Sequence, residues 1–336
     1  MEQHPSQTGS VRAGVADDVV AIVVTYNRLA LLPTCIAAIR GQEPRPDRIV
    51  VVDNASTDGT AEWLAAQKEQ LGSELVVVRQ TNCGSAGAYH AAFETALALG
   101  AHRWIWSTDD DGIAQPGALA ELLEQAERHR LDLVGPMVLA AEDRSVLAFP
   151  MHGRKRPEEL AAAAQDGLVR DSIALFNGSL LHRRVFERIG NIKREMFIWG
   201  DEWEFTLRAR RAGMKAGTAV RALHVHPGMT RHERPVLGGR LGTVEVMPPG
   251  RAPHYFRNLG YIHANYEKAV TIPRTIVKYT AHHLLNRDIK GLGLFLESYL
   301  AGLRDIYPEE QRRPPARLPL PARPAAARSS SSDEVA

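Results

Sequence analysis

Short runs of β-branched residues alternate with longer amphipathic stretches through the first hundred or so residues of the chain. Continuous apolar runs are typical of strands that are buried on both faces. Four such runs predict strands at 19–25, 48–53, 75–79 and 104–107. The intervening stretches predict helices at about 30–41, from 56–60 onward, and from 84 to about 99. This alternation predicts an α/β fold with a mainly parallel central sheet and helices on both faces.

The second half of the chain is less regular. Further strands are predicted at 133–138, 172–176 and 220–225, and a helix at 200–212. The stretch 270–306 is amphipathic and carries the basic residues Lys278, Arg287, Lys290 and Arg304. The chain is therefore expected to divide into a flexible N-terminus (1–17), an α/β domain (18–265), a C-terminal helical region (266–307) and a disordered tail rich in proline, arginine and serine (308–336).

Composition limits the possible classes of protein without choosing among them. A formal net charge of +2 over 336 residues gives no general reason to expect a nucleic-acid partner, and we expect none. The two cysteines, Cys35 and Cys83, form no Cys-x-x-Cys motif, which excludes a disulfide scaffold or a cysteine zinc site and suits a reducing cytosol. The polar start of the chain is not a signal peptide, and no apolar stretch of about 18 residues predicts a transmembrane helix.

Three consecutive carboxylates, Asp109, Asp110 and Asp111, follow the predicted strand 104–107. Placing this charge beside a buried strand is unfavourable unless it is solvated or neutralised. Alternate residues of an extended chain point the same way, so Asp109 and Asp111 can share one cation while Asp110 faces away. Hard oxygen ligands of this kind suit Mg²⁺ or Mn²⁺. The alternative is an exposed acidic turn.

Polar residues also follow the other predicted strands, and ligands of open α/β sheets bind outside the carboxyl ends of the strands. Asp53 can accept hydrogen bonds from a nucleobase edge, although a turn or helix cap is an alternative that fits Asp58 better. Tyr26 can lie against a base or ribose and Arg28 can meet phosphate, or both can simply begin a polar loop.

The segment NCGSAGAY, which begins at Asn82, places glycines directly before a predicted helix. The absence of a Cβ at Gly84 would let a ligand approach the backbone, and a helix N-terminus favours negative charge. The segment is neither a Walker loop nor a GxGxxG motif, so by itself it is a weak signal.

A second acidic group, Asp201, Glu202 and Glu204, opens the helix predicted at 200–212. The helix dipole favours carboxylates in a first turn, so capping alone explains Asp201. It does not explain the flanking Trp199 and Trp203, which would offer flat apolar surface to a sugar ring beside a carboxylate base.

The segment LHVHP puts His224 and His226 on one face of a predicted strand. Neutral imidazole is a common metal ligand, whereas a lone histidine is more often structural. The pattern leaves open whether either histidine binds metal.

Five motifs in this order, VVTYNR, VVDNASTDGT, NCGSAGAY, STDDDG and FIWGDEWEFTLR, resemble those of family 2 glycosyltransferases, which have the GT-A fold. The blocks GPMVLAAEDRSVLAFP, ALFNGSLLHR, LHVHP and HYFRNLGY further resemble the initiating galactofuranosyltransferases of mycobacterial-type galactan synthesis, which extends the likeness to about residue 265.

The resemblance implies an inverting, metal-dependent hexosyltransferase of cell-wall polysaccharide synthesis that uses Mn²⁺ or Mg²⁺. Its donor would be UDP-galactofuranose, and its acceptor a polyprenyl-diphosphate-linked rhamnosyl-N-acetylglucosamine. Alternatives are a rhamnosyl or other hexosyl transferase with a different nucleotide donor, a haloacid-dehalogenase-like phosphatase, and a non-catalytic nucleotide-sugar-binding module.

The resemblance also assigns roles to residues. Glu202 would be the general base, with Asp201 as the reserve, and Trp199, Trp203 and Glu204 would contact the acceptor. Metal ligands would be Asp109, Asp111 and His226. Donor-binding residues would be Thr25, Tyr26, Asn27, Arg28, Asp53, Asn82, Gly84, Asp109 and Asp110, of which Thr25 and Asp53 would hold uridine.

A lipid-linked acceptor would place the protein in the cytoplasm, peripherally at the inner face of the plasma membrane. The basic stretch 270–306 and the arginines of the tail would then touch anionic lipid. The alternative is a helical cap on the catalytic core with a solvated tail.

Overall fold

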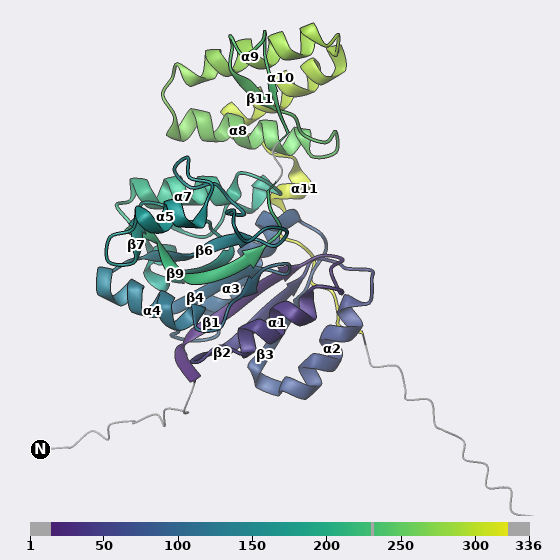
Figure 1. Cartoon of the computed structure of the whole chain (residues 1–336). Helices are drawn as coiled ribbons and strands as arrows, with labels where there is room; N and C mark the ends of the chain where they lie inside the picture. Colours follow the sequence, from purple (N-terminus) through teal and green to yellow (C-terminus); the bar gives the residue numbers. More distant parts are fainter. Residues whose placement is uncertain (1–14, 230–231, 322–336) are drawn as a thin grey trace, which may run out of the picture.

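The structure is a computed structural model that describes residues 15–229 and 232–321. Its central sheet has the strand order β3-β2-β1-β4-β8-β6-β9-β5, with β7 paired to β9 (Figure 1). The strands are β1 (Val15–Thr25), β2 (Arg45–Asp53), β3 (Leu75–Arg79), β4 (Trp104–Asp109), β5 (Ile113–Ala114), β6 (Leu133–Ala140), β7 (Leu168–Arg170), β8 (Asn177–His182) and β9 (Ala216–His226). The half formed by β1 to β4 is parallel, and the other half mixes parallel and antiparallel pairs. The predicted α/β class is confirmed, and its parallel character holds chiefly in the N-terminal half.

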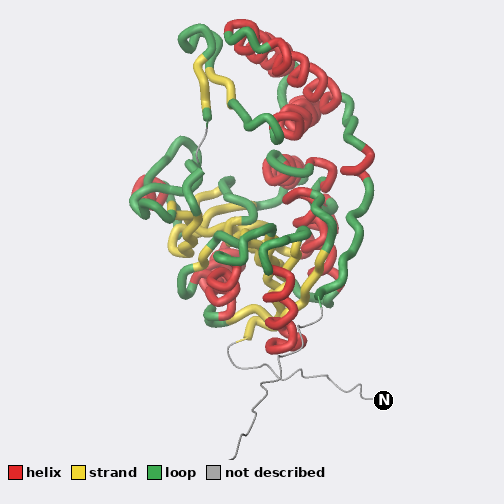
Figure 2. The backbone as a smooth tube through the Cα atoms, turned by 90° about the vertical axis from the view of Figure 1, so that its right-hand side faces the viewer, coloured by secondary structure: helices red, strands yellow, loops and turns green. Residues whose placement is uncertain are grey.

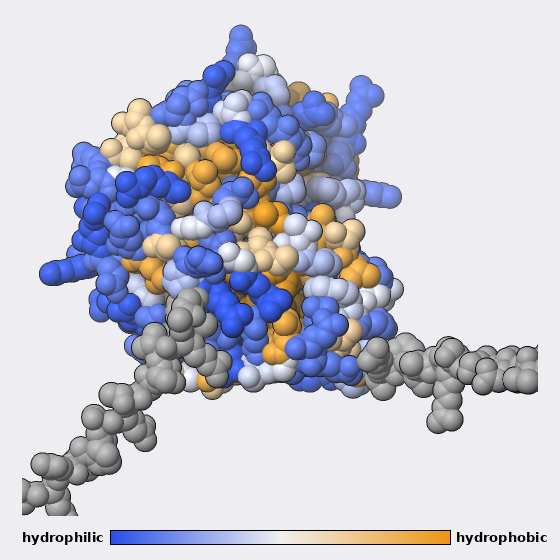
Figure 3. Space-filling view, turned by 60° about the horizontal axis from the view of Figure 1, so that its bottom comes forward, coloured by the Kyte–Doolittle hydropathy of each residue, from blue (hydrophilic) through white to orange (hydrophobic). Residues whose placement is uncertain are grey.

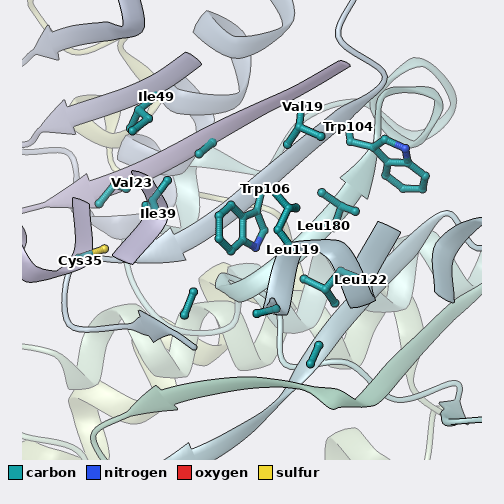
Figure 4. Packing of buried hydrophobic residues seen from close by; sticks show 14 of the residues in the cluster. Val19, Val23, Cys35, Ile39, Ile49, Trp104, Trp106, Leu119, Leu122 and Leu180 are labelled. Carbon is teal, nitrogen blue, oxygen red and sulfur yellow. The ribbon is translucent and has the colours of Figure 1, made fainter. Parts of the chain in front are cut away.

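Side chains of β1 divide between two cores because successive residues of a strand point to opposite faces. Val19, Ala21 and Val23 enter one core, which Figure 4 shows around Trp106 and Leu119. The alternate residues of β1 enter the second core, on the other face of the sheet. The first face is covered by α1 (Leu32–Arg40), α2 (Thr60–Leu71) and α4 (Ala118–His129), and the second by α3 (Gly84–Ala98), α6 (Arg183–Ile189) and α7 (Asp201–Arg211).

The strand predicted at 172–176 is wrong. This stretch is a loop between β7 and β8 whose ends, Asp171 and Phe176, have φ of 57° and 68°, values that interrupt extended pairing. Leu175 and Phe176 are buried all the same, Ile173 and Ala174 are partly buried, and the Phe176 ring stacks on Tyr89 with centroids 3.7 Å apart. Burial of a loop therefore produced the apolar run that resembled a strand.

A C-terminal unit stands over the edge of the sheet at which the β1 strand ends (Figures 1 and 2). It consists of the hairpin β10 (Glu233–Pro235) and β11 (Thr243–Glu245) with α8 (Ala252–Tyr266), α9 (Thr271–Leu285) and α10 (Ile289–Leu303), which share one hydrophobic core. The backbones of α8 and α10 approach so closely that a Cβ at Gly260 or Gly302 would overlap the other helix. The helical region therefore begins before the predicted boundary at 265.

The stretch 308–321, which was predicted to be part of a disordered tail, makes backbone hydrogen bonds to the sheet. After α11 (Glu309–Arg312) the chain runs along the edge strand β3, as Figure 2 shows. The Thr81 amide donates to the Ala316 carbonyl at 2.9 Å, and the Leu318 amide to the Arg79 carbonyl at 2.8 Å. Strand edges have unpaired backbone groups, so even a proline-rich segment can be held there. The remaining predictions of disorder, at 1–14 and 322–336, lie outside the described residues.

The other helices are short: α5 (Pro157–Ala162) and the 3-10 turns 72–74 and 194–196. None of the helices within the described ranges has the length and apolar character needed to cross a bilayer. On the face seen in Figure 3, hydrophobic groups form a broken band bordered by hydrophilic residues.

Candidate active site

Strand β4 delivers the acidic triplet to the edge of the sheet that faces the C-terminal unit. The short strand β5 then pairs antiparallel with β9, with Ile113 opposite Val225, and this pairing brings Asp111 beside His226. Single ligand atoms of Asp109, Asp111 and His226 all lie within 4.8 Å of one another. The structure therefore brings together the three residues that the resemblance named as metal ligands.

The neighbouring His224 has a different environment. It is 1% exposed, its Nε2 lies 3.3 Å from Thr108 Oγ1, and burial, followed by the nearby His226, lowers its pKa to about 3. A Cβ at Gly112 or Gly178 would collide with its ring, so both positions require glycine. Of the two histidines, only His226 points into the acid cluster, and His224 is a neutral core residue.

The pKa values of the three aspartates differ because their burial and their partners differ. Burial raises the pKa of Asp109 to about 6, although a 2.7 Å hydrogen bond from the Tyr89 hydroxyl counters part of that rise. Burial likewise raises the pKa of Asp110 to about 7, against a 2.7 Å hydrogen bond from Thr25 Oγ1. Burial acts in the same direction on Asp111, but its hydrogen bond and ion pair with His226 outweigh it and the pKa falls to about 2.

Buried carboxylates with raised pKa values repel one another, and a divalent cation would remove that repulsion. Two hard oxygen donors and one imidazole are suitable ligands for Mn²⁺ or Mg²⁺. The donor set therefore fits the cation that the resemblance implied.

Arg28 forms a 2.6 Å ion pair with Asp111, so in this structure its guanidinium faces the acid cluster. The adjacent Tyr26 is 47% exposed and leaves its ring surface open to a ligand. Asn27 has a φ of 53° and connects two loops. Its backbone amide donates to Ser56 Oγ, and its side-chain Oδ1 accepts from the Thr57 backbone amide at 2.7 Å. Of these three residues, Tyr26 is the one whose side chain has neither an ion pair nor a hydrogen bond of the kinds just described.

Asp53 is fully buried at the end of β2, paired in register with Thr25. Its two oxygens accept from the Ser56 amide at 2.8 Å and from Arg79 Nε at 3.0 Å. It therefore has the turn-capping role that the sequence pattern favoured for Asp58. Asp58 caps as well, accepting from Thr60 Oγ1 at 2.6 Å.

Asn82 and Gly84 serve the fold at the start of α3. Asn82 Oδ1 accepts from the Gly84 amide at 2.9 Å. Gly84 has a φ of 72°, and a Cβ there would overlap the carbonyl of Phe197, which also accepts from the Ala86 amide at 3.1 Å. The close approach predicted at this glycine is real, but protein backbone occupies the space that was predicted for a ligand.

A pocket of about 640 Å³ opens between the start of α7, the β10–β11 hairpin and α8. Glu202 lines it together with Trp199 and Trp203, and the Trp203 side chain is 41% exposed. The Arg251 guanidinium lies 5.1 Å from the centre of the Trp199 ring. The pocket combines a carboxylate, aromatic faces and a cation. Its other lining residues are Gly200, Met229, His232, Glu245, Val246, Met247, Pro248, Tyr255 and Leu259.

The other two acids of this segment lie away from the pocket lining. Asp201 is 2% exposed, and burial, followed by the charge of Glu202 and a hydrogen bond with it, raises its pKa well above the ordinary range. Glu204 is 1% exposed and accepts from Arg208 at 2.9 Å and from the Tyr266 hydroxyl at 2.6 Å. Both oxygens of Glu204 are therefore used inside the fold, which gives no support to the acceptor contact assigned to it.

Two residues of this region were not identified from the sequence. Tyr89, the last residue of NCGSAGAY, donates to Asp109, and Asn258 in HYFRNLGY donates to the backbone that precedes Asp201. Both stand in motifs that carry the family resemblance, but nothing local indicates that their partners lie 20 and 59 positions away.

Comparison with known proteins gives a consistent result. Residues 20–190 match the family model described as glycosyl transferase family 2. The chain is 33% identical over 303 residues to galactofuranosyltransferase GlfT1 of Mycolicibacterium smegmatis, which spans 86% of this chain and 97% of that protein. It is 32% identical over 299 residues to GlfT1 of Mycobacterium tuberculosis, over 87% and 98% of the two chains. The fold is similar to that of GalNAc-T7 with UDP, GalNAc and Mn²⁺, with a TM-score of 0.57 at 14% identity over 86% of this chain and 58% of that one.

An α/β sheet with an acid cluster and a carboxylate-lined pocket at one edge has the architecture of a GT-A enzyme. The chain belongs to glycosyl transferase family 2 and is a glycosyltransferase related to the galactofuranosyltransferases. This membership removes the haloacid-dehalogenase-like phosphatase as an alternative.

Proposed function

We propose that this enzyme transfers galactofuranose from UDP-galactofuranose to a polyprenyl-diphosphate-linked glycan in cell-wall polysaccharide synthesis, with inversion at the anomeric carbon. The observation that carries the proposal is the position of Glu202, which lines the pocket and lies near enough to Asp109 to raise its pKa. A base beside an acceptor pocket and a cation site beside the same base are the two parts that a single displacement needs.

Asp109, Asp111 and His226 would hold the divalent cation, Mn²⁺ or Mg²⁺. When bound, such a cation stabilises the negative charge that develops on a departing nucleoside diphosphate. The similarity to GalNAc-T7, whose structure contains UDP and Mn²⁺, supports a sugar-nucleotide donor and this choice of cation.

Asp201 and Glu202, at the start of α7, have different roles in proton transfer. Asp201, with its strongly raised pKa, keeps its proton and hydrogen-bonds to Glu202. Glu202 is then free to accept the proton of the acceptor hydroxyl as the new glycosidic bond forms. This division supports Glu202 as the base and gives Asp201 the role of holding it. The indole faces of Trp199 and Trp203 provide the surface for the acceptor sugar.

Donor recognition is assigned to the ends of β1 and β2. Thr25 and Asp53 are opposite each other in the sheet, and the partner of Val24 on β4 is Asp109, so a nucleoside near Asp53 would have its diphosphate near the acid cluster. Asp53 is fully buried with both oxygens engaged, so its part in donor binding would be to hold the Ser56 turn and Arg79 at this edge of the sheet. The exposed ring of Tyr26 can stack on the base.

The test is transfer by Glu202→Gln and Asp201→Asn with UDP-galactofuranose and a synthetic polyprenyl-linked disaccharide. We expect Glu202→Gln to lose transfer by at least about 1,000-fold while UDP binding by calorimetry stays within about twofold, because only the base is removed. Asp201→Asn should lose less, since an amide still donates to Glu202. Glu94→Gln, at an exposed position on α3, is the control. Full transfer by Glu202→Gln would end this assignment.

The same assay separates the alternatives. Transfer from a rhamnosyl or other hexosyl nucleotide at a higher kcat/KM than from UDP-galactofuranose would replace the proposed donor. Binding of UDP-galactofuranose without release of UDP in the presence of acceptor would indicate a non-catalytic binding module.

We further propose that the turn between α9 and α10 contacts anionic lipid and brings the pocket to its lipid-linked acceptor at the inner face of the plasma membrane. Leu284, Leu285 and Ile289 are 52%, 58% and 66% exposed there, beside Arg287 and Lys290. Apolar groups flanked by cations suit a bilayer with anionic head groups. Sedimentation with phosphatidylglycerol vesicles should fall in Leu284→Glu/Leu285→Glu, with transfer to a soluble acceptor unchanged. Equal sedimentation of the wild type and the Leu284→Glu/Leu285→Glu variant would refute the proposed lipid contact.

A further inference from the structure

The backbone that leads into α7 has an unusual conformation. Phe197 has φ 62° and ψ −62°, and the Ile198 amide donates to the Met196 carbonyl at 2.7 Å, which together define a γ-turn of the rare, strained kind. Trp199 and Gly200 follow with φ of 62° and 96°. Non-glycine residues at positive φ are strained and persist only where their surroundings fix them.

Asn258, in the middle of α8, supplies most of those surroundings. Its Nδ2 lies 2.8 Å from the Met196 carbonyl, 3.1 Å from that of Ile198 and 2.6 Å from that of Trp199. The Asn258 side chain is 1% exposed. An amide nitrogen has two hydrogens, so three carbonyls around it share them. One side chain thus contacts the carbonyls of Met196, Ile198 and Trp199, in a segment that forms neither α-helix nor sheet.

Other residues of α8 and of the chain that follows α10 fix Asn258 and the turn in place. The Tyr307 hydroxyl donates to Asn258 Oδ1 at 3.2 Å, which sets the orientation of the amide. His254, one turn earlier on α8, stacks on the Phe197 ring with centroids 4.5 Å apart. A Cβ at Gly200 would lie 3.3 Å from the Asn258 Cβ, so the two backbones are already in close contact.

We propose that Asn258 is a positioning residue for the transfer reaction, which holds the 196–200 turn in the conformation that directs Glu202 into the acceptor pocket. Glu202 lies two residues beyond Gly200, and the direction of a first-turn side chain follows from the backbone at the N-cap. A displacement of about 1 Å of a reacting group can cost about 100-fold in rate. The helical unit that contains α8 is thereby part of the catalytic apparatus and more than a cap on it.

The inference rests on the proposed function, and its experiment has two independent readouts. Steady-state transfer gives kcat and the KM of each substrate, and hydrogen exchange followed by mass spectrometry reports the opening of peptides covering 196–204 without any turnover. The variants are Asn258→Ala, Tyr307→Phe and their combination, with Asn265→Ala as the control at an exposed position of the same helix.

We expect Asn258→Ala to lower kcat by about 30-fold or more, with the donor KM within about twofold and exchange at 196–204 faster by about 10-fold. Tyr307→Phe should lower kcat by about threefold, and the double variant should be no worse than Asn258→Ala alone, because both act through one amide. Asn265→Ala should match the wild type in both readouts.

Unchanged exchange at 196–204 in Asn258→Ala would overturn the proposal, as would a kcat above about half of the wild-type value in the folded variant. If Asn258→Ala fails to fold, Tyr307→Phe provides the test. A Tyr307→Phe protein with the hydrogen exchange and the kcat of the wild type would overturn the proposal. Absence of transfer by the wild-type protein would instead refute the proposed function. The exchange measurement would then test by itself whether Asn258 holds the 196–200 turn.

Discussion

The substitution Asp110→Asn tests the electrostatic account of the acid cluster. Asp110 is 7% exposed, and burial, followed by the hydrogen bond from Thr25 and the charges of Asp109 and Asp111, sets its pKa at about 7 instead of the ordinary 3.8. A carboxyl whose pKa is raised by folding binds its proton more tightly in the folded state than in the unfolded state. Its contribution to stability is therefore present at low pH and is lost as the pH rises from about 4 towards 7.

The size of this effect follows from the pKa values. One pKa unit corresponds to about 1.4 kcal/mol. Between about pH 5 and about pH 8 the unfolded carboxyl is ionised throughout, whereas the folded one must lose its proton, which lowers the free energy of unfolding by about 2–3 kcal/mol. Asparagine has the shape of the protonated acid, keeps an oxygen that can accept from Thr25, and does not titrate.

Urea unfolding with a metal chelator present, at about pH 5 and about pH 8, measures the difference. We expect the stability of Asp110→Asn relative to the wild type to be greater at about pH 8 than at about pH 5 by about 2 kcal/mol, or about 4–8 °C in Tm. Asp166→Asn, at an exposed loop position, is the control and should show no such dependence. A stability difference between Asp110→Asn and the wild type that is equal at both pH values, or that moves against the variant from about pH 5 to about pH 8, would refute the reasoning.

Three further predictions concern neighbouring parts of the molecule. His226→Ala should weaken Mn²⁺ binding by at least about 10-fold in calorimetry, and retained affinity would exclude His226 as a ligand. In the wild type, Mn²⁺ binding should weaken as the pH falls, because a protonated imidazole cannot bind metal and the ion pair with Asp111 raises the pKa of His226 despite its burial. Glu204→Gln should lower the free energy of unfolding by about 1–3 kcal/mol through loss of its ion pair with Arg208, with the acceptor KM unchanged, and a raised KM would return it to the acceptor site. Truncation after residue 313 should cost about 1–3 kcal/mol, since the chain that pairs with β3 is lost, and an unchanged Tm would show that this pairing contributes nothing.

The raised pKa values of Asp109 and Asp110 also affect the stability of the folded protein. Asp109 and Asp110, buried at one strand end, lower the stability of the protein without a cation, and binding of Mn²⁺ to the folded state alone would restore it. Sites of this kind trade stability for function. The same reasoning applies to the strained turn before Glu202, which costs folding energy and directs a side chain.

The sequence alone determined the α/β class, the four parallel strands of the N-terminal half and the order of the motifs along them. Strands buried on both faces must be continuously apolar, and the polar residues that follow them must gather at one edge of the sheet, so both features can be recognised in local sequence. The acid cluster was predicted for the same reason, because Asp109 and Asp111 follow such a strand directly.

Only the tertiary structure decided which of the local candidates meet. The choice of His226 over His224 depends on the register of β5 against β9, and the removal of Glu204 from the pocket depends on Arg208 and Tyr266. Asn258 acquires its role from a loop 59 to 62 positions earlier in the chain. Hydrophobic period and residue type report what a segment buries, whereas pairing register and contacts across the fold are set by the packing of elements distant in sequence, which no local pattern encodes.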